Sequence, residues 1–158
     1  MAGSASSKGK AGLDTSYLVA LLCGWHEFHE RTRMDFEGRR RAGARLVVPV
    51  HALLECFSVL TRLPAPYRLT PALARELMSH NFRGSVEVPF LSNEDCWELL
   101  AGLSTRGIGG GKIWDAVIAH SCRTAGATIL LTWDASDFRA VAPPDLHVLQ
   151  PEKTDSPT

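Results

Sequence analysis

The chain has 158 residues, the length of one ordinary domain, with 45% hydrophobic and 22% charged residues. Its 17 basic and 17 acidic residues cancel. Because a neutral protein has little long-range attraction for polyanions, the composition argues against a general RNA-coating protein. A chain of this length also buries enough surface to fold without disulfides or a structural metal.

The chain carries no feature of a membrane or secreted protein. No apolar run approaches the ~20 residues that cross a bilayer, and residues 1–12 lack the apolar core of a signal peptide. The cysteines are far apart in apolar contexts, without a C-x-x-C pair, so we expect buried reduced thiols in a cytoplasmic protein with no membrane partner. We expect one domain over residues 11–150, with disordered tails at 1–10 and 151–158.

Apolar runs that predict strands alternate along the chain with segments that predict helices. Strands are expected to end at 13–14 and to cover 46–50, 86–89, 127–132 and 146–149. Helices are expected at 15–23, 25–42, 51–62, 70–82, 93–105, 112–126 and 135–141. Continuous apolar runs indicate strands covered on both faces, hence a parallel sheet. The predicted fold is a three-layer α/β/α fold with a mainly parallel sheet of about five strands.

Local signals mark several of the helix ends. Thr70 followed by Pro71 is typical of an N-cap with proline at the first helical position. Ser92 precedes Glu94 and Asp95 and is likewise predicted to be a helix N-cap. Gly126 is placed to end a helix.

Four carboxylates fall where open parallel sheets bind ligands, beyond the carboxyl ends of the strands. Asp14 follows the first strand and Asp134 follows the strand at 127–132. Asp115 lies in the first turn of a helix, and Glu55 lies on the helix that leaves the second strand. Capping explains Asp14 and Asp134 equally well, and the helix dipole explains Asp115.

Glu55 is harder to explain by local structure. No other formally charged residue occurs between His51 and Thr61 if that histidine is neutral. A solitary carboxylate in such a helix is expected to be substantially buried, which is costly unless a cation pairs with it. No neighbour in the sequence supplies that cation.

A shared site explains all four acids together. Two carboxylates ~4 Å apart repel by about 4 kcal/mol at an effective dielectric near 20, and a divalent cation removes that cost. Oxygen ligands favour Mg²⁺ or Mn²⁺ over Zn²⁺. Such an ion activates a bound water and neutralises charge on a phosphoryl group, so phosphodiester hydrolysis is the predicted chemistry.

Four segments of the chain resemble PIN-domain proteins, in particular VapC-type toxins of bacterial toxin–antitoxin pairs. They are LDTSYLVA at 13–20, LLE at 53–55, GKIWDAVIA at 111–119 and LLTWDASDF at 130–138. The resemblance implies a metal-dependent endoribonuclease, a cognate antitoxin that occludes the site, and a homodimer. It also implies that the metal-binding and catalytic quartet is Asp14, Glu55, Asp115 and Asp134.

Other residues are candidates for supporting roles. Hydroxyl groups near the metal waters would come from Thr15, Ser16 and Thr132, although capping explains each of them too. Asp137 is expected to support a helix start rather than to bind metal. Phosphate contacts are expected from the basic cluster Arg39, Arg40 and Arg41. They are also expected from Lys112, which follows a glycine-rich loop that lacks the P-loop pattern.

Some features leave alternatives open. Trp114 and Trp133 flank two of the acids and could stack on bases, but apolar packing explains them as well. The stretch from Trp25 to Arg45 is basic and longer than expected of a minimal family member. A non-catalytic PIN-like module that binds RNA or protein, a structure-specific DNA nuclease and a metal-dependent phosphatase remain alternatives to a ribonuclease.

Overall fold

The computed structural model describes residues 9–152 of the chain. Its parallel sheet has the order β2-β1-β3-β4, with bounds Arg45–Val47, Lys10–Leu13, Ile129–Leu131 and His147–Leu149. Within the central strand, Gly12 pairs with Val47 on one side and with Leu130 on the other. The predicted three-layer α/β/α fold is confirmed, with four strands in place of about five.

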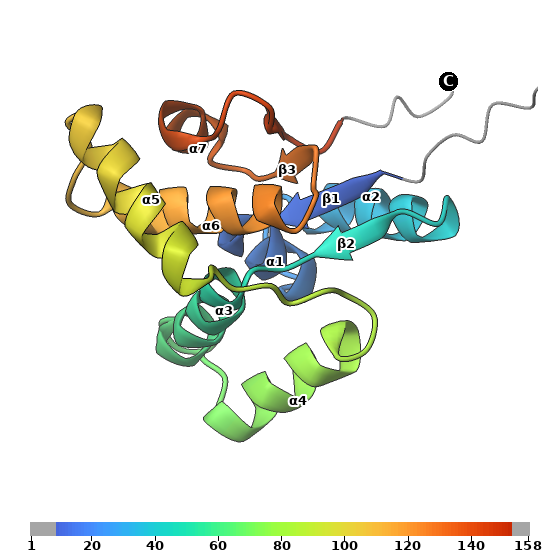
Figure 1. Cartoon of the computed structure of the whole chain (residues 1–158). Helices are drawn as coiled ribbons and strands as arrows, with labels where there is room; N and C mark the ends of the chain where they lie inside the picture. Colours follow the sequence, from blue (N-terminus) through green and yellow to red (C-terminus); the bar gives the residue numbers. More distant parts are fainter. Residues whose placement is uncertain (1–8, 153–158) are drawn as a thin grey trace, which may run out of the picture.

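Helices cover both faces of this sheet. In Figure 1, α6 crosses in front of the strands and α2 lies behind them, while α4 lies below, next to α3. The helices are α1 Thr15–Leu22, α2 His29–Arg41, α3 Val50–Arg62, α4 Pro71–Phe82, α5 Asn93–Thr105, α6 Lys112–Thr124 and α7 Ala135–Val141.

The expected fifth strand, residues 86–89, is reduced to a single bridge between Val47 and Glu87. This segment still runs beside β2, because the Val48 amide donates to the Glu87 carbonyl and the Val50 amide donates to the Pro89 carbonyl. Pro89 has no amide to donate in return, so the ladder cannot continue.

The helix expected at 25–42 begins four residues late, at His29. Residues 25–28 form turns instead, in which the His26 amide donates to the Cys23 carbonyl and the His29 amide to the His26 carbonyl. The His26 side chain also accepts a hydrogen bond from the Phe28 amide at 3.1 Å. Such local side-chain bonds compete with helix formation, and they explain the late start.

The predicted helix-end signals are confirmed. Thr70 accepts a hydrogen bond from the Leu73 amide at the start of α4. Ser92 and Asp95 form a reciprocal capping box on α5. Gly126 follows the end of α6 with a φ of 86°, a left-handed conformation that glycine adopts without steric cost.

A close contact between β1 and α6 positions two of the predicted acids. A side chain on Gly12 would place its Cβ 2.4 Å from the Cys122 sulfur, so only glycine allows this approach. Because Gly12 precedes Asp14 by two residues and α6 carries Asp115, the contact sets the distance between two segments that bear acids.

Three of the cysteines are buried free thiols, as expected: Cys23, Cys56 and Cys122. Cys96 is exposed instead, because α5 buries only Leu99 and Leu103. The expected tails fall mostly outside the described residues, and the boundaries of a single domain at 11–150 stay a prediction. Within residues 9–152, no helix is long and apolar enough to cross a membrane.

Candidate active site

Asp14 lies where β1 passes into α1, and only 2% of it is exposed. Its carboxylate accepts hydrogen bonds from the Tyr17 amide at 2.9 Å, the Thr132 hydroxyl at 2.6 Å and the Ser16 hydroxyl at 2.9 Å. Burial outweighs these donors and raises the pKa of Asp14 to about 7. Asp14 therefore caps α1 and is also a buried carboxylate at the carboxyl end of a strand.

Two hydroxyl groups hold the loop after β3 against this carboxylate. The Thr132 hydroxyl, which donates to Asp14, accepts a hydrogen bond from the Asp134 amide at 2.9 Å. The Ser16 hydroxyl, which also donates to Asp14, accepts one from the Trp133 amide at 2.8 Å. Both hydroxyls are thus fully engaged in fixing the backbone that carries Asp134.

Asp115 lies in the first turn of α6, where the helix dipole favours a carboxylate, and Asp134 lies at the start of α7. Asp134 occupies the N-cap position of α7, yet its side chain makes no capping hydrogen bond. Burial raises the pKa of both carboxyls, and the negative charge of Asp137 raises both further. For Asp115, the charges of Glu55 and Asp134 add to the increase. These acids are therefore close enough to repel one another.

Glu55 is only half-buried, less than its apolar sequence context predicted. Its side chain lines a pocket rather than the core, and the Thr15 hydroxyl donates a hydrogen bond to it. Within residues 9–152, Glu55 forms no ion pair with a lysine, arginine or histidine. The cation that its position calls for is not supplied by the described part of the chain.

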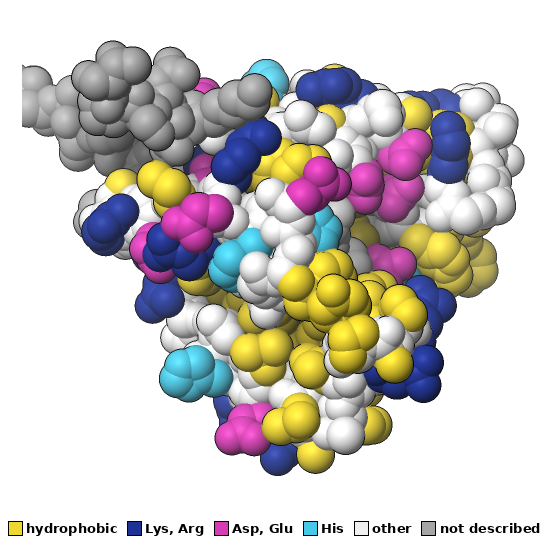
Figure 2. Space-filling view, turned by 180° about the vertical axis from the view of Figure 1, so that it is seen from behind, with side chains coloured by type: hydrophobic (Ala, Val, Ile, Leu, Met, Phe, Trp, Pro, Cys, Tyr) yellow, Lys and Arg dark blue, Asp and Glu magenta, His cyan; other side chains and the backbone are white. Residues whose placement is uncertain are grey.

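Asp14, Glu55, Asp115 and Asp134 line one pocket of about 430 Å³, which we call the acid pocket. They come from the start of α1, from α3, from α6 and from the start of α7. Figure 2 shows a face of the molecule on which acidic side chains border a hollow, with hydrophobic side chains gathered next to it. No lysine or arginine lines the acid pocket in the described part of the chain.

The donor set suits a hard divalent cation, although the side chains are not closed around one point. Among residues 9–152, no three carboxylate, histidine or cysteine side chains stand ready to hold one ion. The raised pKa values of three acids, together with a pocket lining that holds no lysine or arginine among residues 9–152, fit a cation that offsets their repulsion. Binding would require the acid side chains to rotate toward each other.

Among the residues that line the acid pocket, the sequence reasoning assigned no site role to His26, Glu27 and Phe28, whose segment does not match the zinc-binding pattern H-E-x-x-H. They lie in the turns between α1 and α2, where a helix was expected. The signal that could have found them is the aromatic and histidine content of residues 25–29 directly after Gly24.

The candidate RNA-contacting residues do not line the acid pocket. Arg39 forms an ion pair with Asp35 at 2.9 Å, and Asp35 also accepts a hydrogen bond from Tyr17. The guanidinium of Arg40 lies over the ring of Phe36. A role in RNA binding for these arginines, and for the exposed Arg41 and Lys112, stays a prediction.

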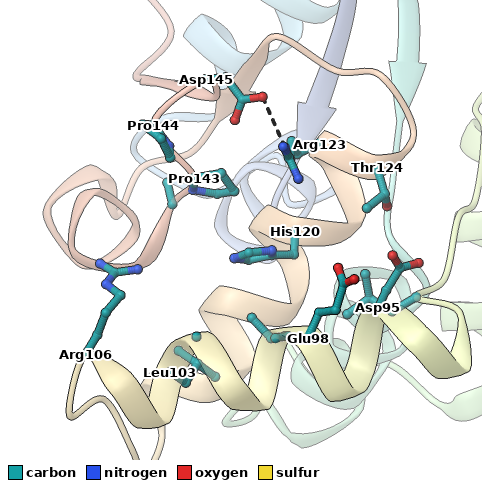
Figure 3. Close-up of a pocket in the computed structure, with 14 residues that line it drawn as sticks. Asp95, Glu98, Leu103, Arg106, His120, Arg123, Thr124, Pro143, Pro144 and Asp145 are labelled. Atoms are coloured by element: carbon teal, nitrogen blue, oxygen red, sulfur yellow. Dashed lines mark hydrogen bonds and ion pairs between the residues drawn. The ribbon is translucent and has the colours of Figure 1, made fainter.

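A larger pocket of about 790 Å³ lies between α5, α6 and the loop before β4, and we call it the α5–α6 pocket. Figure 3 shows Glu98 and Asp95 on α5 with His120 and Arg123 on α6. Arg123 is paired with Asp145 at 3.1 Å, and Arg106 donates to the Ala140 carbonyl. None of the predicted site residues lines it, so pocket size alone does not identify the candidate site.

Comparison with known proteins identifies the family of this chain. A family profile described as PIN domain matches residues 12–143, which include all four acids. The chain belongs to the PIN-domain family. This PIN-domain protein is 33% identical over 132 residues to Ribonuclease VapC40 of Mycobacterium tuberculosis, covering 81% of this chain and 87% of the relative.

Two solved structures share the fold of this PIN-domain protein. VapC20 of Mycobacterium tuberculosis, described as a Sarcin-Ricin loop cleaving toxin, has a TM-score of 0.62 and 17% identity, covering 84% of this chain and 96% of that one. VapBC2 from Rickettsia felis, bound to a DNA fragment from their promoter, has a TM-score of 0.63 and 15% identity, covering 89% and 98%. At these identities the likeness concerns the fold.

Proposed function

We propose that this PIN-domain protein is an endoribonuclease that hydrolyses RNA phosphodiester bonds with Mg²⁺ or Mn²⁺. One observation carries the proposal: four acids from four separate segments line one pocket that contains no lysine or arginine from the described residues 9–152. The relative named Ribonuclease VapC40 supports RNA as the substrate. The catalytic and metal-binding residues in this proposal are Asp14, Glu55, Asp115 and Asp134.

The chain's own groups prepare the pocket for a metal ion. When bound, such an ion activates water and neutralises charge on the scissile phosphate. The hydroxyls of Ser16 and Thr132 hold the Asp14 carboxylate in one orientation, and the Thr15 hydroxyl does the same for Glu55. Because the hydroxyls engage carboxylate oxygens, they act as positioning groups rather than as proton donors to substrate.

The protein is further proposed to be the toxin of a toxin–antitoxin pair in the cytoplasm. Solved neighbours include VapBC2 of Rickettsia felis and VapBC-1 of nontypeable Haemophilus influenzae, and VapC20 is itself described as a toxin. A cognate antitoxin that covers the acid pocket would keep the nuclease inactive in the cell. Coexpression with the protein encoded beside it, followed by a cleavage assay of the complex, tests this partner.

A homodimer is the proposed oligomeric state, and an exposed apolar surface supports it. Large hydrophobic side chains from α3, α6 and the segment before α5 gather around one groove, namely Leu54, Trp114 and Phe90. Exposed apolar patches of this kind mark protein interfaces. Phe90→Asp should convert a dimer to a monomer in light-scattering measurements, and an unchanged dimer would place the interface elsewhere.

The cleavage proposal is tested with purified protein and a mixed RNA pool, with Mg²⁺ or Mn²⁺ and with EDTA. We expect the metal-loaded wild type to cut RNA, EDTA to stop it, and Glu55→Gln to lose the activity. Single-stranded DNA, duplex DNA and simple phosphate esters run in parallel to separate a ribonuclease from a DNA nuclease or a phosphatase. No cutting of RNA by the antitoxin-free, metal-loaded wild type would contradict the proposal.

A further inference from the structure

Six side chains form a continuous row of neighbouring groups that passes along the wall of the acid pocket and ends on the surface. In order, the row consists of Arg31, Trp133, Phe28, His26, Trp25 and Tyr67. His26, Phe28 and Trp133 line the acid pocket itself. The row therefore joins the acids to an exposed aromatic surface.

The inner half of the row is packed and fixed. Trp133 stacks on Phe28 with ring centroids 4.1 Å apart and an angle of 14°, and its indole nitrogen donates to the Thr32 hydroxyl at 3.0 Å. The guanidinium of Arg31 lies 4.9 Å from the centre of the Trp133 ring and donates to the Pro151 carbonyl. These contacts give the inner rings a structural role, and they hold flat surfaces beside the carboxylates.

The outer half of the row is exposed in a way that packing does not explain. The rings of Trp25 and Tyr67 lie 4.4 Å apart, yet 48% of Trp25 and 44% of Tyr67 remain accessible to solvent. Trp25 comes from the turns after α1 and Tyr67 from the loop between α3 and α4. Two loops thus place large aromatic rings together at the surface, where burial gains little.

We propose that the exposed outer end of this row, Trp25 with Tyr67, binds unpaired bases of single-stranded RNA and so places the adjoining phosphodiester over the acids. The inference rests on the proposed ribonuclease function and names a base-binding subsite beside the acid pocket. Every base has a flat face that stacks on aromatic rings regardless of sequence. In a duplex these faces are covered by neighbouring bases, so the row selects unpaired nucleotides.

The charge of the protein strengthens this assignment. The acid pocket lacks lysine and arginine among its described residues, so side-chain attraction to phosphates contributes little at the pocket itself. At this place, binding energy for RNA must come from contacts with the bases. The share of binding that Trp25 and Tyr67 contribute should consequently depend weakly on salt concentration, unlike binding through many phosphate contacts.

His26 adds a polar contact at the middle of the row. Its Nδ1 accepts a hydrogen bond from the Phe28 amide, so in the neutral ring the proton sits on Nε2. No hydrogen bond of Nε2 joins it to another residue within 9–152. That N–H is a donor for the edge of a base or for a phosphate oxygen next to the acids.

The test measures binding rather than cleavage, by fluorescence anisotropy with a labelled unpaired RNA of about 12 nucleotides. The parent protein carries Asp115→Asn, so the RNA stays intact. Trp25→Ala and Tyr67→Ala are each added to it, and Trp97→Ala is the matched control. Trp97 lies on α5, is 64% exposed and does not line the acid pocket.

We expect Trp25→Ala and Tyr67→Ala each to weaken binding about ten-fold and the control to bind like the parent. A fully paired hairpin of similar composition should bind the parent more weakly than the unpaired RNA does. Equal binding by all four proteins, or a preference for the hairpin, would overturn the inference. Tight, ring-dependent binding by the parent beside a wild type that cuts no RNA would instead contradict the proposed function alone.

Discussion

Acidic side chains line both the acid pocket and the α5–α6 pocket, but only the α5–α6 pocket also has arginines among its described lining residues. In the larger α5–α6 pocket, hydrogen bonds from Ser92 and Arg123 lower the pKa of Asp95 and Asp145 respectively. In the acid pocket, burial and neighbouring acids raise the pKa of Asp115 and Asp134. Asp95 and Asp145 thus have partners that favour their charged forms, whereas Asp115 and Asp134 lie among charges of the same sign.

This difference teaches that unsatisfied charge is a better guide to a reaction centre than pocket volume. An ion pair that is complete within the fold has little left to offer a ligand. Carboxylates that repel one another lower the stability of the fold until a cation binds. Such a group of acids is therefore expected where binding or catalysis requires it. The predictions below separate the two pockets by experiment.

The largest expected effect is on cleavage by an acid-pocket variant. Asp115→Asn keeps the shape of the side chain and removes its charge, so we expect RNA cleavage to fall by about 10³-fold or more, a loss typical of removing a charge-stabilising group. The measurement is the rate of cutting of a labelled RNA with Mg²⁺. The circular dichroism spectrum should match the wild type, and a fully active Asp115→Asn protein would remove the acid pocket from the mechanism.

A second effect concerns stability against pH in the absence of metal. The pKa of Asp14 is about 7 in the folded protein against an ordinary value of 3.8, so the folded state binds more protons between these values. The contribution to the free energy of unfolding is therefore complete below pH 3.8, falls as pH rises, and is lost above about pH 7. Between these two limits, the contribution of Asp14 to the free energy of unfolding changes by about 4 kcal/mol.

Asp14→Asn isolates this contribution, because asparagine has no charge to bury. In EDTA at pH 8 the variant should be more stable than the wild type in urea unfolding, and the difference should shrink toward pH 4. The same variant should lose cleavage activity. If Asp14→Asn is less stable than the wild type at every pH, the capping role of Asp14 dominates and its buried charge is not a cost.

A third effect is stabilisation by metal. At pH 8, Mg²⁺ at 100 times its dissociation constant should stabilise the wild type by about 2.7 kcal/mol, since it binds the folded state alone. The thermal midpoint in Mg²⁺ and in EDTA measures this directly. Glu55→Gln should show a smaller increase, and an increase equal to that of the wild type would mean that Mg²⁺ binds elsewhere.

The smallest effect is expected in the α5–α6 pocket. Arg123 and Asp145 form an ion pair in which both side chains are about half exposed, and such pairs contribute little to stability. Arg123→Ala should therefore leave the thermal midpoint and RNA cleavage close to the wild type. A marked loss of cleavage would show that this pocket takes part in the reaction.

Much of the fold was predictable because strong local signals agree with the tertiary structure. The capping box at Ser92 and the glycine at 126 fixed helix ends that the structure reproduces. Local hydrogen bonds at His26 accompany the turns at 25–28, but the stacking of Phe28 on Trp133 was not predictable, because Trp133 lies far away in the sequence. The strand expected at 86–89 is reduced to one bridge, because Pro89 has no amide with which to continue the ladder.

The site was predictable only in part for the same reason. Asp14, Asp115 and Asp134 at strand and helix ends could be expected to meet, since ligand sites form at the carboxyl edge of a parallel sheet, and Glu55 could be added to them from its uncompensated charge in α3. The row of aromatic side chains could not be predicted as a unit, because Phe28, Trp133 and the loop residues that form it share no common period in the sequence. The depth of Glu55 was overestimated, since Ala52, Cys56 and Leu60 of α3 face the core while Glu55 faces the pocket.

The most direct test of the account is the anomalous scattering of Mn²⁺ in crystals of the antitoxin-free protein. The account predicts one or two strong peaks in the acid pocket, with oxygen atoms of Asp14 and Asp115 about 2.1 Å from an ion. Glu55→Gln crystals should show a weaker peak. A peak only in the α5–α6 pocket, or none in Mn²⁺-saturated crystals that cut RNA when dissolved, would contradict the central claim that these four acids form the metal site.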